Sequence, residues 1–165
     1  MDSSLRWKDK TFLHKYEAKI AWNRNGAKFT DVQYSRAHQW SFDGGITVPA
    51  SSSPLAVKLP LSVAEAVDPE EALVASASSC HMLMFLYLAA KKGFVIDSYE
   101  DNAFGEMGKN SAAKAAITRI TLRPDIKFTP EKIPSPAELD ALHHQAHDEC
   151  FIANTIKSEV VVAPA

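Results

Sequence analysis

The feature that most constrains the fold is a long stretch without charged side chains. Residues 72–90 contain no Asp, Glu, Lys or Arg. Just before this stretch, Asp68 can cap free helix amides, Pro69 suits the first helical position, and two glutamates favour the positive end of the helix dipole. At the other end of the stretch, two lysines favour the negative end of the helix dipole, and Gly93 is typical of the residue that follows a helix. The pattern predicts one continuous helix from residue 69 to about residue 92.

A segment of this length and polarity is also typical of a membrane span. However, three serines and His81 dilute its first half, and both ends run into β-like sequence. We therefore expect the central helix of a soluble domain and no membrane association. The helix is apolar on nearly all faces from Leu83 to Ala90, so other elements must cover most of its sides. At 1.5 Å per residue it extends about 36 Å, longer than a small domain is wide. A second copy of the chain is expected to help cover it.

The sequence on both sides of this helix is β-like. In residues 16–22 apolar side chains alternate with Glu17 and Lys19, and Asn25-Gly26 is typical of a hairpin turn. A loop with proline at both ends is expected over residues 49–54. Further strands are expected at residues 28–34, 36–42, 94–104, 116–128 and 156–162.

A second helix is expected after Pro134. Ser135 and Glu138 have the spacing of a capping box, in which each side chain satisfies a free backbone amide of the first turn. This helix is expected to end near Cys150. The order of strands, long helix, strands, helix and strand predicts an α+β architecture, and the length fits a single domain over residues 1–165.

Composition excludes some classes of partner. The net charge of −2 and the absence of any block of like charges make nucleic acid an unexpected partner. The first ten residues lack the apolar core of a signal peptide. With only two cysteines, a reducing cytoplasm is expected, where a disulfide is more often transient than structural.

The two cysteines are the residues best suited to chemistry. Cys80 lies in the middle of the predicted helix beside Ser76, Ala77 and Ser79, which leave space at the sulfur. Such a thiol is either a buried small hydrophobe or a nucleophile, and the residues alone leave both readings open. His81 points about 100° away from Cys80 on a helix, so the neighbours do not form a Cys-His pair. We expect His81 to make a polar interaction or to line a dimer seam.

Metal binding is a further use of these residue types. His143 and His147 have i, i+4 spacing on the second helix, with His144 and Cys150 nearby. The chain has no Cys-x-x-Cys pair, which disfavours zinc and leaves a Cys/His metal-binding protein as a third possibility.

Three segments resemble the OsmC/Ohr family of thiol peroxidases. The first is the helix start at Pro69-Glu70-Glu71 with a cysteine ten positions after Glu70, on a helix of small residues. The second is Ala146-His147-Asp148-Glu149-Cys150-Phe151-Ile152-Ala153-Asn154, similar to the family's Ala-His-x-x-Cys-x-x-x-Asn segment. The third is Trp22-Asn23-Arg24-Asn25-Gly26, which is like the turn that carries the family's active-site arginine. Order and spacing agree over residues 15–163.

The resemblance implies an OsmC-like fold with antiparallel sheets around a long central helix, assembled as an intertwined homodimer. It also implies a reductase for organic hydroperoxides without bound cofactor or metal. Cys80 would be the attacking thiolate, and Cys150 would resolve the resulting sulfenic acid to a disulfide. Arg24 would favour the thiolate and orient the peroxide, and Glu70 would hold Arg24. A dithiol, such as a lipoylated protein, would reduce the disulfide.

The sequence departs from the peroxide-resistance branch in two places. A histidine follows Cys80, and residues 34–45, which include His38, look more like a less characterised OsmC-like branch, where Arg36 could replace Arg24. Glu70 would lie about 15 Å from Cys80 along one helix and cannot touch it. It must act through Arg24 or from the partner subunit, or else serve only the first helical turn. The alternative function is a non-enzymatic OsmC-like dimer that binds an apolar small molecule in its interface cleft.

Overall fold

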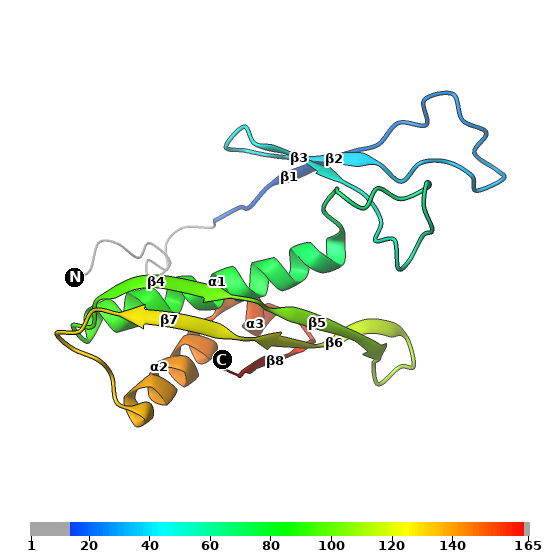
Figure 1. Ribbon diagram of the computed structural model, residues 1–165. Helices are drawn as coiled ribbons and strands as arrows, with labels where there is room; N and C mark the ends of the chain where they lie inside the picture. Colours follow the sequence, from blue (N-terminus) through cyan, green and yellow to red (C-terminus); the bar gives the residue numbers. More distant parts are fainter. Residues whose placement is uncertain (1–13, 164–165) are drawn as a thin grey trace. The chain divides into compact units, whose positions relative to one another are not determined.

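The computed structural model describes residues 14–163 and divides into two compact units, one ending at Val67 and one beginning at Asp68. Together they contain the predicted mixture of antiparallel strands and a long helix, so the fold is α+β (Figure 1).

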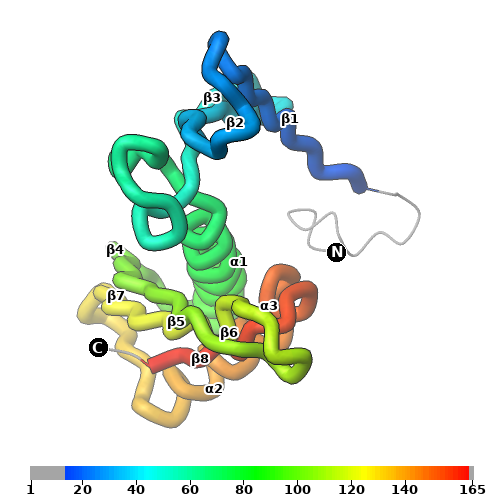
Figure 2. Tube along the Cα trace, turned by 90° about the vertical axis from the view of Figure 1, so that its right-hand side faces the viewer, coloured from blue at the N-terminus to red at the C-terminus, as the bar shows by residue number. Residues whose placement is uncertain are grey.

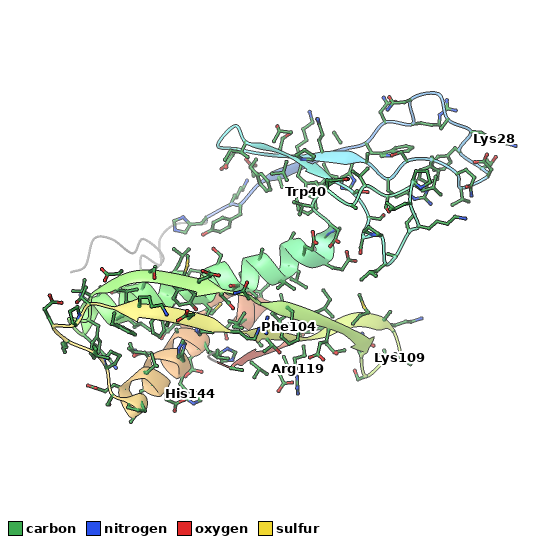
Figure 3. The ribbon with its side chains drawn as sticks, viewed as in Figure 1. Lys28, Trp40, Phe104, Lys109, Arg119 and His144 are labelled. Atoms are coloured by element: carbon green, nitrogen blue, oxygen red, sulfur yellow. The ribbon has the colours of Figure 1, made fainter. Side chains whose placement is uncertain are left out.

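The first unit is built on a three-stranded antiparallel sheet in the order β1-β2-β3. The strands are β1 (Ala18–Ala21), β2 (His38–Phe42) and β3 (Thr47–Ala50). Trp40, labelled in Figure 3, lies in the middle strand. A tight turn joins β2 to β3, and Gly45 adopts a positive φ of 87° there, which a residue without Cβ tolerates.

The predicted strand at residues 28–34 is wrong, and Asn25-Gly26 does not close a hairpin. Both turn residues have the expected positive φ, but β1 pairs with β2, so residues 22–37 form a long connection. An aromatic cluster holds this connection together: the ring of Phe29 stacks on Tyr34 at 4.7 Å, and Trp22 meets Tyr34 edge-on at 5.4 Å. Aromatic packing within the loop therefore replaces the expected cross-strand pairing.

The predicted loop at residues 49–54 begins two residues later than expected. Pro49 and Ala50 belong to β3, and Pro49 is tolerated because β3 is an edge strand. The free edge of β3 still makes a backbone hydrogen bond at this residue: the Pro49 carbonyl accepts from the amide of Val67 at 3.1 Å.

The predicted long helix is confirmed as α1 (Pro69–Lys91), which begins the second unit. The Asp68 side chain accepts a hydrogen bond from the Glu71 amide at 2.7 Å, and the Glu71 carboxylate accepts one from the Asp68 amide at 3.4 Å. This capping box satisfies two otherwise free amides at the helix start. Gly93, with φ of 77°, follows the last turn as expected.

The second predicted helix is confirmed as α2 (Pro136–Glu149), with the expected capping box between Ser135 and Glu138. A third helix that the sequence did not predict, α3 (Phe151–Thr155), follows after a single residue, Cys150.

Five strands complete the second unit. Strands β4 (Ile96–Asp101) and β7 (Pro124–Phe128) pair antiparallel. Strands β5 (Phe104–Lys109), β6 (Ala115–Leu122) and β8 (Glu159–Val162) form a sheet in the order β5-β6-β8, in which β8 runs parallel to β6. Figure 2 looks almost along α1 and shows these strands gathered on one side of it, with α3 on another.

The stretch 116–128, predicted as continuous β structure, splits into β6 and β7 at Arg123. The amide of Arg123 donates to the Asp101 carboxylate at 2.6 Å rather than to a strand, and Pro124, which has no amide hydrogen, begins β7. This break lets one chain segment serve two sheets.

Two buried clusters join α1 to the rest of its unit. In the first, Phe85 of α1 packs with Leu142 and Ala146 of α2 and with partly buried residues of β4 and β7. In the second, Ala77 packs with Ile120 and Leu122 of β6. Only one side of the helix is covered within the unit, and Leu83 on another side is 60% exposed. By length and composition alone α1 could cross a membrane, but its covered side forms the core of an α+β unit.

Candidate functional site

Cys80 lies at the middle of α1, where the helix passes from small to large side chains. Its side chain is partly buried. Ala77, one turn earlier, is buried in the core, whereas Ser76 and Ser79 are exposed. The thiol therefore lies at the border between the core of the second unit and the uncovered side of the helix.

Cys150 occupies the single residue between α2 and α3. Its backbone is extended, with φ of −71° and ψ of 114°, and its side chain is 0% exposed. Its amide donates to the carbonyl of His147 at 3.2 Å, and its Sγ accepts a hydrogen bond from the Ala153 amide at 3.5 Å. The Cys150 sulfur thus caps the start of α3, and the backbone of the same residue ends α2.

The side chain of Asn154 supports this junction. Its Nδ2 donates to the carbonyl oxygens of Asp148 at 2.8 Å and of Cys150 at 3.0 Å. Both carbonyls lie at the end of α2, where helical partners are missing. Asn154 was part of the second sequence motif, but sequence reasoning assigned it no role, because its contacts depend on α3, a helix that the sequence did not predict.

The structure brings the two thiols together. Cys80 and Cys150 are both free, and Cys80 lies close enough to Cys150 to raise the pKa of the Cys150 thiol. Burial raises the pKa of the Cys150 thiol to about 11; the Ala153 amide opposes this shift and the proximity of Cys80 adds to it. Cys150 therefore keeps its proton at neutral pH, and the S–H group is available as a donor to Cys80.

A pair of buried histidines links the same two helices. His81, the residue after Cys80, is 1% exposed, and its Nε2 lies 3.1 Å from Nδ1 of His143 on α2. The two imidazole rings are nearly parallel, with an interplanar angle of 11°, and His143 also packs on Phe85 with ring centroids 4.5 Å apart. The expected polar interaction of His81 is present, and its partner is His143.

Both histidines of this pair are neutral at pH 7. Burial is the largest cause, and charge repulsion from His143 and His147 adds to it; together they lower the pKa of His81 to about 4. Burial also lowers the pKa of His143 to about 4, opposed by Asp140 and aided by His144. The contact is therefore an N–H···N hydrogen bond between two neutral rings. Sequence reasoning had flagged His143 and His147 only as metal ligands.

The two candidate arginines lie in the first unit. The Arg24 guanidinium donates to the carbonyl of Ala27 at 2.9 Å, within its own turn. Arg36 lies over the ring of Tyr34, 4.0 Å from its centroid, and donates to the carbonyls of Val32 and Tyr34. Both therefore have local partners inside the connection between β1 and β2.

His38 has a local role in the same unit. Its Nδ1 donates to the carbonyl of Arg36 at 2.7 Å, and its Nε2 accepts from the Trp40 indole at 2.9 Å. These two bonds hold the ring at the start of β2.

Glu70 lies in the first turn of α1, half-buried. Because α1 is continuous from Pro69 to Lys91, Glu70 and Cys80 are about 15 Å apart along the axis. The sequence-based argument that these two side chains cannot touch within one chain is therefore supported. Among residues 14–163, no group of three or more His, Cys, Asp or Glu side chains is arranged to hold a metal ion.

Comparison with known proteins agrees with this fold. The model of the OsmC-like protein family matches residues 62–164. An OsmC-like protein of unknown function from Vibrio cholerae is 49% identical, with 93% of this chain and 100% of that chain covered and a TM-score of 0.90. No protein with a curated description matches.

More distant solved structures share the fold. A Legionella pneumophila protein described as organic hydroperoxide resistance protein OsmC is 16% identical, with a TM-score of 0.64 over 93% of this chain and 96% of that one. The organic hydroperoxide resistance protein OhrB of Bacillus subtilis is 15% identical, with a TM-score of 0.64 over 92% and 98%. The family match and the 49% identity over nearly the whole length lead to one assignment: this chain belongs to the OsmC-like family.

Proposed function

We propose that the protein is a two-cysteine peroxidase that reduces organic hydroperoxides. The observation that carries this proposal is the proximity of a partly exposed thiol, Cys80, to a fully buried one, Cys150, in a chain with no other cysteine. A pair arranged in this way suits attack by the first thiol and resolution by the second.

The reaction balances without a further oxidant. The Cys80 thiolate attacks the distal oxygen of the hydroperoxide, the O–O bond breaks, and the alcohol leaves with a proton. The product is a sulfenic acid at Cys80. The Cys150 sulfur then attacks the Cys80 sulfur and forms the disulfide, and the displaced hydroxyl leaves as water with the Cys150 proton.

Burial and local contacts support this division of roles. Cys80 lies at the border of the uncovered side of α1 and is only partly buried, whereas Cys150 is fully buried. The high pKa of Cys150 keeps it protonated while Cys80 attacks, and its S–H group can donate to the Cys80 thiolate. Oxidation of Cys80 removes that acceptor, which frees the Cys150 proton to leave with the hydroxyl.

A homodimer is part of the proposal. The side of α1 that bears Leu83 is exposed in a single chain, and the small sheet of the first unit has little buried apolar area of its own. A second copy that covers both would form the intertwined dimer expected from the sequence and would complete one OsmC-like domain per chain. Either Arg24 or Arg36 would then lie beside Cys80, positioned by Glu70 of the same or the partner subunit, and would stabilise the thiolate.

The cellular setting follows from the chemistry. A disulfide that forms in each cycle needs a reducing partner, and a dithiol such as a lipoylated protein can supply both thiols. A reducing cytoplasm fits this requirement, and neither nucleic acid nor membrane is part of the cycle. The organic hydroperoxide resistance proteins of Legionella pneumophila and Bacillus subtilis share this fold, and their names support the same substrate class here.

The test is turnover of tert-butyl or cumene hydroperoxide with dihydrolipoamide by wild type, Cys80→Ser and Cys150→Ser. We expect Cys80→Ser to be inactive. We expect Cys150→Ser to react once and then stall as a sulfenic acid. Equal rates in all three proteins would end the proposal and favour the non-enzymatic alternative, a dimer that binds an apolar small molecule.

A further inference from the structure

The His81–His143 pair has no part in the peroxidase steps described above, yet it joins the two helices that carry the cysteines. His81 follows Cys80 on α1, and His143 lies two turns before Cys150 on α2. Their hydrogen bond of 3.1 Å is therefore a short link between the segment that holds the attacking thiol and the segment that holds the resolving one.

The residues around the two histidines hold their rings in a single arrangement. His81 and His143 are 1% and 5% exposed, and Phe85 packs on both rings, with centroids 6.5 Å from His81 and 4.5 Å from His143. Nδ1 of His81 and Nε2 of His143 are buried with no protein partner among the described residues. The contact between the two rings is thus the only protein hydrogen bond found for either imidazole there, so breaking it would leave two buried rings unsatisfied.

Two apolar side chains in place of His81 and His143 would cost less free energy to bury, because buried polar groups that lack partners are destabilising. What a hydrogen bond adds over apolar packing is direction: it fixes how far α2 slides and rotates against α1. Because Cys80 lies on α1 and Cys150 directly follows α2, a movement of this kind would change the distance between the two cysteines.

We propose that the His81–His143 hydrogen bond is a positioning device that holds the Cys150 sulfur within bonding reach of Cys80. This inference rests on the proposed function, in which Cys150 resolves an oxidised Cys80. The histidines touch neither substrate nor sulfur in the reaction; they act through the relative placement of α1 and α2. Loss of the bond lowers the rate at which Cys150 reaches Cys80 and leaves the reactivity of Cys80 itself unchanged.

The test uses 2,2′-dithiodipyridine in place of a hydroperoxide. The Cys80 thiolate displaces one pyridinethione and forms a mixed disulfide in the first phase. The Cys150 sulfur then loses its proton and attacks the Cys80 sulfur, which forms the Cys80–Cys150 disulfide and displaces the second pyridinethione. Absorbance of pyridinethione in stopped flow follows both phases, so the second phase reports the approach of the two cysteines without peroxidase turnover.

Matched substitutions separate the hydrogen bond from general packing. The bond uses Nδ1 of His143, whose position an Asn amide approximates and a Gln amide does not. We expect His143→Leu and His143→Gln to slow the second phase by about tenfold, with the first phase within about twofold of wild type. We expect His143→Asn to restore the second phase. His144→Leu is the control on the same helix, because the His144 side chain, labelled in Figure 3, is 77% exposed.

Circular dichroism establishes which variants are folded. If His143→Leu does not fold, the comparison of His143→Asn with His143→Gln still tests the positioning role. A second phase at the wild-type rate in His143→Gln, or one slowed equally in the Asn and Gln variants, would overturn the positioning role. A fast second phase in a protein that turns over no hydroperoxide would overturn the proposed function and leave the positioning role intact.

Discussion

Acidification should destabilise the protein through the buried histidine pair. In the unfolded chain His81 takes up a proton near its ordinary pKa of 6.5, whereas in the folded protein burial holds its pKa at about 4. Between these values the unfolded state binds more protons than the folded state, so the free energy of unfolding falls as the pH falls. The stabilisation is fully present above pH 6.5 and is lost progressively toward pH 4.

The size of the effect follows from the same two values. At pH 5 the unfolded imidazole is almost fully protonated and the folded one is mostly neutral. At 1.36 kcal/mol per pKa unit, acidification from pH 7.5 to pH 5 removes about 2 kcal/mol through His81 alone. His143, whose pKa is also lowered to about 4, acts in the same direction. Because the two rings share a hydrogen bond, their contributions are not additive.

Urea unfolding at pH 7.5 and pH 5, at one fixed protein concentration, measures this loss. The comparison protein is the double variant His81→Leu with His143→Leu, which removes both titrating rings and leaves neither partner alone. We expect the wild type to lose at least about 2 kcal/mol more than this variant over the interval. His144→Gln should stay close to wild type, because the side chain at position 144 is exposed and its effect on the pKa of His143 is the smallest of the causes. Equal losses in wild type and double variant would refute the reasoning.

Three further changes test the fold and the cysteine site. Phe85→Ala should lower the free energy of unfolding by about 3–5 kcal/mol in urea titrations, because the 0% exposed ring joins α1 to α2 and the sheet; a loss below about 1 kcal/mol would contradict this core assignment. Asp68→Ala should cost about 1 kcal/mol through loss of the capping box, whereas Asp68→Asn should cost less, and equal costs would argue against capping. Asn154→Ala should slow disulfide formation by Cys150 while leaving the first reaction of Cys80 unchanged, as measured with 2,2′-dithiodipyridine; an unchanged second phase would show that the junction holds without this amide.

The helices could be predicted from the sequence because their signals are local. Asp68 and Ser135 both cap their helices as expected, and the capping box predicted at Ser135 forms; Glu71 completes a second capping box at Asp68 that was not predicted. The connection at residues 22–37 could not be predicted in this way. Residues 28–34 favour a strand, but the contacts of Phe29 with Tyr34 and Trp22 outweigh that preference.

The site was predictable in part. The motifs around Cys80 and Cys150 pointed to two thiols that act together, and in the structure Cys80 lies close enough to raise the pKa of the Cys150 thiol. The role of Asn154 depends on the short helix α3, and the His81–His143 bond depends on how α1 and α2 pack; neither was predicted from the sequence. Arg24, Arg36 and Glu70 remain predictions, because their action on Cys80 depends on the assembly of two chains.

The most direct test of the account is the intact mass of the reduced protein after one equivalent of tert-butyl hydroperoxide, with peptide mapping of the product. The account predicts a protein lighter by two hydrogens, with a disulfide between Cys80 and Cys150, and a Cys150→Ser variant heavier by one oxygen at Cys80. Two unmodified free thiols in the wild type after complete exposure to the peroxide would contradict it.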